Sequence, residues 1–129
     1  MNYKNFEELP CWQKARELCK VVFKLINASK IKEDFSLRDQ ILRASGSVMD
    51  NIAEGFDDGS TREIRRFLGY AQRSCGEVQS QLYRALDCQY INENQFSDVY
   101  QLASECRKQN KGLRKYLRNY DKECNKFYE

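Results

Sequence analysis

The sequence contains no histidine, a single proline and only six glycines. Without histidine, a Ser-His or Cys-His nucleophile is impossible, and the common zinc sites lose one of their usual ligands. Lysine, aspartate, glutamate, tyrosine or cysteine could still act in catalysis, but no motif groups them into a recognisable catalytic constellation. Because proline and glycine are scarce, few positions interrupt a helix, and the composition favours long helices.

Long hydrophobic runs are also missing. No apolar stretch approaches the roughly 20 residues that are needed to span a bilayer. The N-terminus mixes Lys4 with Glu7 and Glu8, which is unlike a secretory signal. The chain has 129 residues, of which 41% are hydrophobic, so it can bury a core without covalent staples. We therefore expect a soluble, cytoplasmic protein with one domain over residues 1–129 and no membrane association.

Cysteine is present, but not in a metal-binding pattern. The chain has no CxxC pair, and its six cysteines are widely scattered: Cys11, Cys19, Cys75, Cys88, Cys106 and Cys124. Zinc sites usually need closer spacing. Cys75 and Cys106 fall on apolar helix positions, where free cysteine is common. We predict buried or incidental thiols in preference to a disulfide, a metal centre or a redox site, and we expect no cofactor.

Apolar residues at helical spacing predict four helices, over about residues 10–28, 37–56, 61–89 and 93–121. The first helix is expected to begin near Pro10, a residue suited to a first turn. The second is expected to begin after Ser36, a candidate N-cap, and to stop at Gly55 and the run Asp57-Asp58-Gly59. The third opens with Ser60 and Glu63, the pattern of a capping box.

The last two predicted helices carry heptad seams without a fault. The third has core positions at Ile64, Leu68, Ala71, Cys75, Val78, Leu82 and Ala85. The fourth has them at Phe96, Val99, Ala103, Cys106, Asn110, Leu113, Leu117 and Tyr120. A seven-residue period favours shallow crossing between long helices, and short loops make neighbouring helices antiparallel. The sequence therefore predicts an all-α fold, an antiparallel up-down-up-down four-helix bundle.

One face of the fourth predicted helix is strongly basic. Seven cations lie within 16 residues: Arg107, Lys108, Lys111, Arg114, Lys115, Arg118 and Lys122. With Cys106 at heptad position d, they occupy positions e, b and f, a contiguous face of roughly 100°. Only Asp121 interrupts this face. A stripe about 20 Å long could follow a phosphate backbone, so the pattern predicts binding of RNA or DNA.

The alternative interpretation of the stripe is an ordinary solvated helix face. No aromatic residue interleaves with the seven cations at these positions. That absence favours contact with the nucleic-acid backbone over the stacking of single-stranded bases.

Several polar or small residues lie at unusual helix positions. Gly69 and Gly76 share one face of the third helix, although each glycine costs about 1 kcal/mol there. We expect another backbone to approach them; a neighbouring subunit is one candidate for this oligomer interface, and incidental tolerance is the rival. Asn110, in the fourth seam, could specify register or partner choice. Asn51 and Glu54 are predicted to satisfy loose backbone groups at the corner between the second and third helices, not to catalyse a reaction.

The motifs of the chain occur in a characteristic order from Trp12 to Ile91. They are Trp12-Gln13-Lys14-Ala15, Leu37-Arg38, Gln40-Ile41-Leu42-Arg43-Ala44, Asn51-Ile52-Ala53-Glu54-Gly55-Phe56, Ser60, Glu63, Phe67-Leu68, Ala71, Ser74, Glu77, Gln81-Leu82 and Tyr90-Ile91. This pattern resembles the four-helix-bundle proteins encoded in intervening sequences of bacterial 23S ribosomal RNA genes, often labelled S23 ribosomal proteins. It is also similar to the accessory variability determinant of diversity-generating retroelements.

The resemblance implies a homopentameric ring of bundles with no established enzymatic activity. The retroelement relative implies a reverse transcriptase as partner and binding of nucleic acid. One departure concerns the loop after Phe56, where the family commonly has a basic residue and this chain has Asp57 and Asp58. We predict a non-enzymatic homo-oligomer that associates with nucleic acid through the basic face. The alternative is a scaffold that binds a partner protein, for example a reverse transcriptase, without nucleic-acid affinity of its own.

Overall fold

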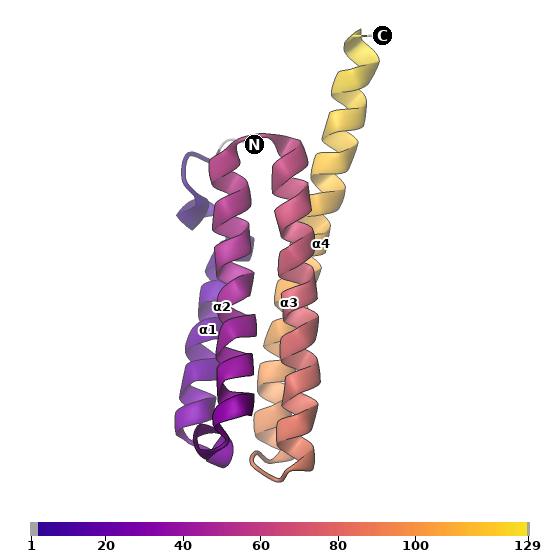
Figure 1. Ribbon diagram of the computed structural model, residues 1–129. Coiled ribbons are helices and arrows are strands. Elements are labelled where there is room, and N and C mark those ends of the chain that lie inside the picture. Colours follow the sequence, from indigo (N-terminus) through magenta and orange to yellow (C-terminus); the bar gives the residue numbers. More distant parts are fainter. Residues whose placement is uncertain (1–2, 129) are drawn as a thin grey trace.

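The structure is a computed structural model that describes residues 3–128, and side chains as far as residue 124. Its elements are η1 (Phe6–Glu8), α1 (Pro10–Asn27), η2 (Lys30–Glu33), α2 (Phe35–Asp58), α3 (Thr61–Asp87) and α4 (Glu93–Tyr128). The four long helices run alternately up and down (Figure 1), and α1 packs against α4 as well as α2, which closes the bundle. Residues 3–128 contain no strand. The predicted antiparallel four-helix bundle is confirmed.

The N-cap of α2 differs from the prediction. Asp34 caps the helix, because its Oδ1 accepts a hydrogen bond of 3.1 Å from the amide of Leu37. Ser36 lies inside the first turn, where its hydroxyl accepts a hydrogen bond from the side chain of Gln40. The prediction of Ser36 was wrong because aspartate and serine are equally good caps, and both stand at the start of the apolar pattern.

The sequence suggested that α2 stops at Gly55, but Gly55 does not end the helix. The helix continues to Asp58, and Gly59 follows in the left-handed conformation, with φ at 81°. Gly55 is buried against α3: a Cβ atom added there would lie 2.6 Å from Cβ of Phe67. The missing side chain therefore allows α2 and α3 to approach closely, and the glycine that ends the helix is the one four residues later.

The start of α3 follows the prediction in part. Oγ of Ser60 accepts a hydrogen bond of 3.1 Å from the amide of Glu63. The carboxylate of Glu63 lies 3.5 Å from Nε of Arg66, so within the described chain only one half of the predicted capping box forms. Every predicted seam position of α3 is buried.

The seam of α4 is correct except at its end. Tyr120 is 44% exposed, although the heptad pattern placed it in the core. At this level α3 has reached its first residue, because the hydroxyl of Thr61 donates a hydrogen bond of 2.7 Å to Asp121. Beyond it, α4 continues past the other helices (Figure 1). Tyr120 is exposed because α3 does not extend as far as the heptad pattern of α4 and so does not cover it.

Asn110 is fully buried in that seam. Its side-chain amide donates a hydrogen bond of 2.8 Å to the carbonyl of Cys106, one turn earlier in α4. Its Oδ1 atom has no hydrogen-bond partner among the described residues. A buried polar atom without a partner lowers stability, so Asn110 is a cost within this chain.

All six cysteines are free thiols, and Cys75 and Cys106 are buried as predicted. Burial raises the pKa of Cys11 and of Cys19 to about 11. A hydrogen bond with the thiol of Cys75, together with burial, also raises the pKa of Cys106. In the part of the chain that the structure describes, no group of three or more Cys, Asp or Glu side chains could hold a metal ion. No described helix is long and apolar enough to cross a membrane.

Candidate nucleic-acid interface

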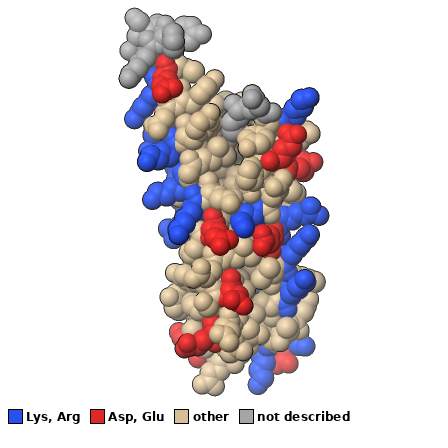
Figure 2. Space-filling view, turned by 180° about the vertical axis from the view of Figure 1, so that it is seen from behind, with Lys and Arg blue, Asp and Glu red and all other residues tan. Residues whose placement is uncertain are grey.

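The seven cations predicted on α4 lie along its outer side. Six are exposed, and the seventh, Arg114, is partly buried. The ion pairs of the described chain involve none of the seven, so no carboxylate oxygen lies within 4.0 Å of them. Figure 2 shows a column of Lys and Arg side chains on the edge of the molecule that leads to the C-terminal end of α4. We call these seven residues the α4 stripe.

Two acidic side chains of α4 are turned away from the stripe. A carboxylate oxygen of Asp121 lies 3.1 Å from Arg65 of α3, and another accepts the hydrogen bond from Thr61. Glu105 lies 3.3 Å from Lys14 of α1, on the opposite flank of α4. Because both carboxylates are paired elsewhere, they do not neutralise the stripe.

Two arginines of the stripe lie across glycines of α3. The guanidinium of Arg114 is 3.2 Å from the position that a Cβ of Gly69 would occupy, and that of Arg107 is 3.8 Å from the corresponding position at Gly76. Arg114 also donates a hydrogen bond to Gln72. Within one chain, arginine side chains therefore fill the space that we expected another backbone to enter. The predicted subunit contact at Gly69 and Gly76 stays a prediction.

The cationic surface extends onto α3, which the sequence reasoning missed. Arg66 and Arg73 are exposed, and both guanidinium groups lie over the ring of Tyr70, at 5.8 and 5.6 Å from its centroid. The two arginines are seven residues apart and occupy heptad position f, next to the row that contains Gly69 and Gly76. That spacing indicates that they share one face of α3, and the packing of α3 against α4 places this face beside the α4 stripe.

The comparisons with known proteins agree with the motif pattern. A family model described as 23S rRNA-intervening sequence protein matches residues 7–112. The chain belongs to this family. The match ends within the α4 stripe, so the second half of the stripe lies beyond the matched residues. The resemblance to the retroelement accessory protein stays a prediction.

The fold is shared with a solved member of the family. It is similar to the crystal structure of a protein of unknown function from the S23 ribosomal protein family of Bacteroides thetaiotaomicron, with a TM-score of 0.74 and 22% identity. The similarity covers 81% of this chain and 98% of that chain. No curated protein matches. Neither this family nor this solved structure has been assigned an enzymatic activity by its description.

Asn51 does not lie at the corner between α2 and α3, where the sequence predicted it. It is inside α2, and its side-chain amide donates hydrogen bonds of 2.8 Å to the carbonyl and to the hydroxyl of Ser47. The hydroxyl of Ser74 in α3 donates to the same hydroxyl at 3.1 Å. The prediction that Asn51 satisfies the helix corner was wrong, because α2 continues for two more turns. Its polar contacts instead join α2 to α3 beside an open groove of about 320 Å³.

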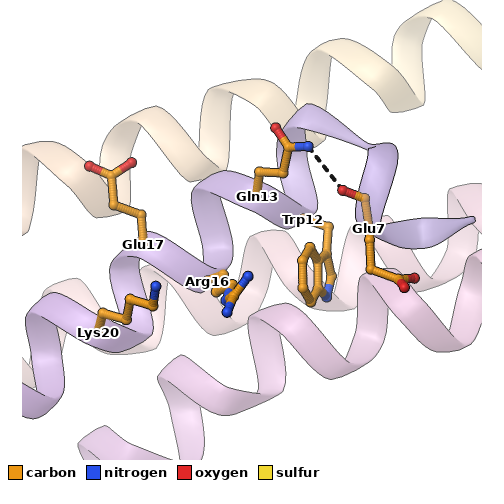
Figure 3. Close-up of a pocket in the computed structure, with 6 residues that line it drawn as sticks. All are labelled: Glu7, Trp12, Gln13, Arg16, Glu17 and Lys20. Atoms are coloured by element: carbon orange, nitrogen blue, oxygen red, sulfur yellow. Dashed lines mark hydrogen bonds between the residues drawn. The ribbon is translucent and has the colours of Figure 1, made fainter.

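A second hollow, of about 430 Å³, lies at the start of α1 (Figure 3). The side-chain amide of Gln13 donates a hydrogen bond of 2.9 Å to the carbonyl of Glu7, and the guanidinium of Arg16 lies 5.9 Å from the centroid of Trp12. Glu17 and Lys20 complete a wall of mixed charge. This hollow presents no surface of one sign, which distinguishes it from the α4 stripe.

Proposed function

We propose that this member of the 23S rRNA-intervening sequence protein family is a non-enzymatic protein that binds the phosphate backbone of nucleic acid through the α4 stripe. The observation that carries the proposal is that six exposed cations line one helix face without a carboxylate partner among the described residues. Unpaired cations can replace the counterions that condense on nucleic acid, and the release of those counterions drives binding.

The length of the stripe fits this role. From Arg107 to Lys122 the helix rises about 22 Å. One strand of B-form DNA carries a phosphate about every 3.4 Å, so the stripe spans about six phosphates. The number of exposed cations on the stripe is the same. Contacts of this kind hold the backbone without reading the bases, so the binding should be independent of sequence.

We propose in addition that the protein forms a homo-oligomer, a pentamer on the resemblance to its family. Five copies of the stripe would raise the avidity for a long polyanion. A subunit docked over Gly69 and Gly76 would cover Arg107 and Arg114. This surface therefore cannot be a subunit interface and a nucleic-acid interface at the same time. The guanidinium groups that already fill the space above the glycines favour the nucleic-acid role.

A titration of labelled duplex RNA and duplex DNA tests the proposal. Lys111, Lys115 and Arg118 are exposed, so replacing all three by glutamate leaves the core intact. Arg114 is left unchanged because it packs against α3. With six phosphate contacts, log K should fall with log salt at a slope of about −5.4, and the triple variant should reduce the slope by about 3.

The matched control reverses three exposed cations on another part of the bundle, Lys20, Lys24 and Lys32. It changes the net charge by the same amount, and its binding should stay close to that of the natural protein. Circular dichroism checks that both variants are helical. Binding that is insensitive to salt, or an equal loss in the two variants, would refute the proposed stripe.

A protein scaffold is the second candidate, and two exposed phenylalanines favour it. Phe35 is 66% exposed and Phe23 is 58% exposed, and exposed aromatic side chains are frequent anchors of protein interfaces. This function predicts no nucleic-acid affinity at physiological salt. It also predicts a discrete partner in a pull-down, such as a reverse transcriptase encoded by a neighbouring gene, and loss of that partner when Phe35 is replaced by serine.

A further inference from the structure

We infer that the bound nucleic acid is single-stranded and lies along the α3–α4 edge, the side of the bundle where α3 packs against the α4 stripe. At one end of this edge, one of its bases stacks on an aromatic cluster. The cluster consists of Tyr83, Phe96 and Tyr100, and it lies at the end of the edge away from the C-terminus of α4. The inference rests on the proposed function, and it names the class of ligand as single-stranded nucleic acid.

The cluster holds one ring in place and leaves it open to solvent. The centroid of Tyr83 lies 4.8 Å from that of Phe96 and 5.7 Å from that of Tyr100. Phe96 and Tyr100 stack on each other at 5.2 Å and are partly buried, whereas Tyr83 is 49% exposed. A ring fixed by two neighbours loses little conformational freedom when a base stacks on it, which favours binding.

The cluster is in register with the α4 stripe. Contacts between α3 and α4 recur every seven residues on both helices. The ring of Tyr83 contacts that of Tyr100. One heptad further along, the guanidinium of Arg107 lies over Gly76, and one heptad after that the guanidinium of Arg114 lies over Gly69. Each step is about 10 Å along the helices. A chain that follows the two arginines along this edge therefore reaches Tyr83 at the next step.

Stacking and charge together favour an unpaired strand. Proteins that bind single strands combine a positively charged track for the backbone with aromatic side chains for the bases. In a duplex the bases are already stacked on one another, so Tyr83 would have no free face to contact. The other tyrosine on this side of α3, Tyr70, is covered by Arg66 and Arg73, which leaves Tyr83 as the available ring.

Sequence reasoning did not find this platform because only one of its residues lies on the basic face. Tyr100 occupies heptad position e, one heptad before Arg107. Tyr83 belongs to α3, and it joins the stripe only through the register between the two helices.

Fluorescence anisotropy with labelled oligomers of about 12 nucleotides, within the usual site sizes of single-strand-binding domains, tests the inference. Single-stranded RNA, single-stranded DNA and a blunt duplex of the same sequence are titrated separately, so that the two single strands identify the source of the ligand. Tyr83→Leu keeps apolar packing but removes the aromatic face. It should weaken single-strand binding about 5-fold or more and leave duplex binding unchanged.

Tyr83→Phe should restore single-strand binding, because the stacking face returns without the hydroxyl. Tyr116→Leu is the matched control, since Tyr116 is an exposed tyrosine at heptad position g, on the other side of α4. Equal behaviour of Tyr83→Leu and Tyr116→Leu would overturn the inference.

A separate outcome distinguishes the inference from the proposed function. If reversal of Lys111, Lys115 and Arg118 weakens binding while Tyr83→Leu does not, the stripe binds backbone and the stacking platform is wrong. If Tyr83→Leu changes self-association or the capture of a partner protein without changing nucleic-acid binding, the cluster is a protein interface and the inference is overturned. If no oligomer binds at all, the proposed function fails with it.

Discussion

Replacement of Gly55 by alanine should separate two effects of opposite sign. In a helix interior alanine is favoured over glycine by about 1 kcal/mol. At Gly46, also in α2, an added Cβ meets nothing within 4 Å, so Gly46→Ala should stabilise the protein by about 0.5–1 kcal/mol. At Gly55 the added Cβ would lie 2.6 Å from Cβ of Phe67 and 3.4 Å from the carbonyl oxygen of Glu63.

The contact at Gly55 cannot be relieved by a change of rotamer. Cβ of Phe67 is attached directly to the backbone of α3, so the two helices must move apart. Such overpacking costs about 1–3 kcal/mol, and the propensity gain of about 1 kcal/mol offsets part of it. We expect Gly55→Ala to lower the free energy of unfolding by up to about 2 kcal/mol, and to differ from Gly46→Ala by about 1–3 kcal/mol.

Urea unfolding followed by far-ultraviolet circular dichroism measures both variants under the same conditions. A double-mutant cycle with Phe67→Gly identifies the cause, because glycine removes the Cβ atom that an alanine at position 55 would meet, and Gly55→Ala should then become favourable. If Gly55→Ala raises the free energy of unfolding as much as Gly46→Ala does, then α2 and α3 do not approach as described, and the reasoning is refuted.

Three further predictions concern capping, the seam and the thiols. Asp34→Ala should lower the free energy of unfolding by about 1 kcal/mol in urea titrations, whereas Ser36→Ala should leave it nearly unchanged. Asn110→Leu should raise that free energy by about 1 kcal/mol or more, because a buried oxygen without a partner is removed; a decrease would contradict the described seam. Folding raises the pKa of Cys11 and Cys19 from 9.0 to about 11, so their contribution to stability is complete below pH 9 and is lost as the pH rises through 11. Iodoacetamide alkylation, mapped by mass spectrometry, should therefore be slow at both residues at pH 8 in the folded protein, because few of these thiols are ionised; rapid alkylation would refute the raised pKa values.

Apolar periodicity was enough to predict the fold because it repeats. In α3 the same face recurs seven times from Ile64 to Ala85, and every position is buried. Boundaries rest on single residues and were less predictable. Asp34 and Ser36 have the same capping chemistry, and only the geometry of the first turn chooses between them. Gly55 was mistaken for a helix end because a glycine that terminates a helix and a glycine that permits close packing look alike in a sequence.

Only the part of the candidate site on α4 could be predicted from the sequence, for a related reason. The α4 stripe lies within one helix, so its face follows from the heptad pattern alone. Arg66 and Arg73 of α3, and the platform at Tyr83, depend on how far α3 is displaced along α4. That register is set by the length of the loop and by contacts such as the hydrogen bond between Gln79 and Ser104. One helical pattern carries no information about it.

The regular contacts between α3 and α4 also restrict how this chain can change in length. One residue inserted into α4 between Tyr100 and Arg107 would turn everything after it by about 100° around the helix axis. The cations of the α4 stripe would then point toward the core and Leu117 would point into water. The insertion would therefore destabilise the fold and also remove the cationic surface. An insertion in the connection between Asp87 and Glu93 leaves that phase untouched. Among descendants of this gene, insertions should therefore occur in the connections between the helices and be selected against within the helices.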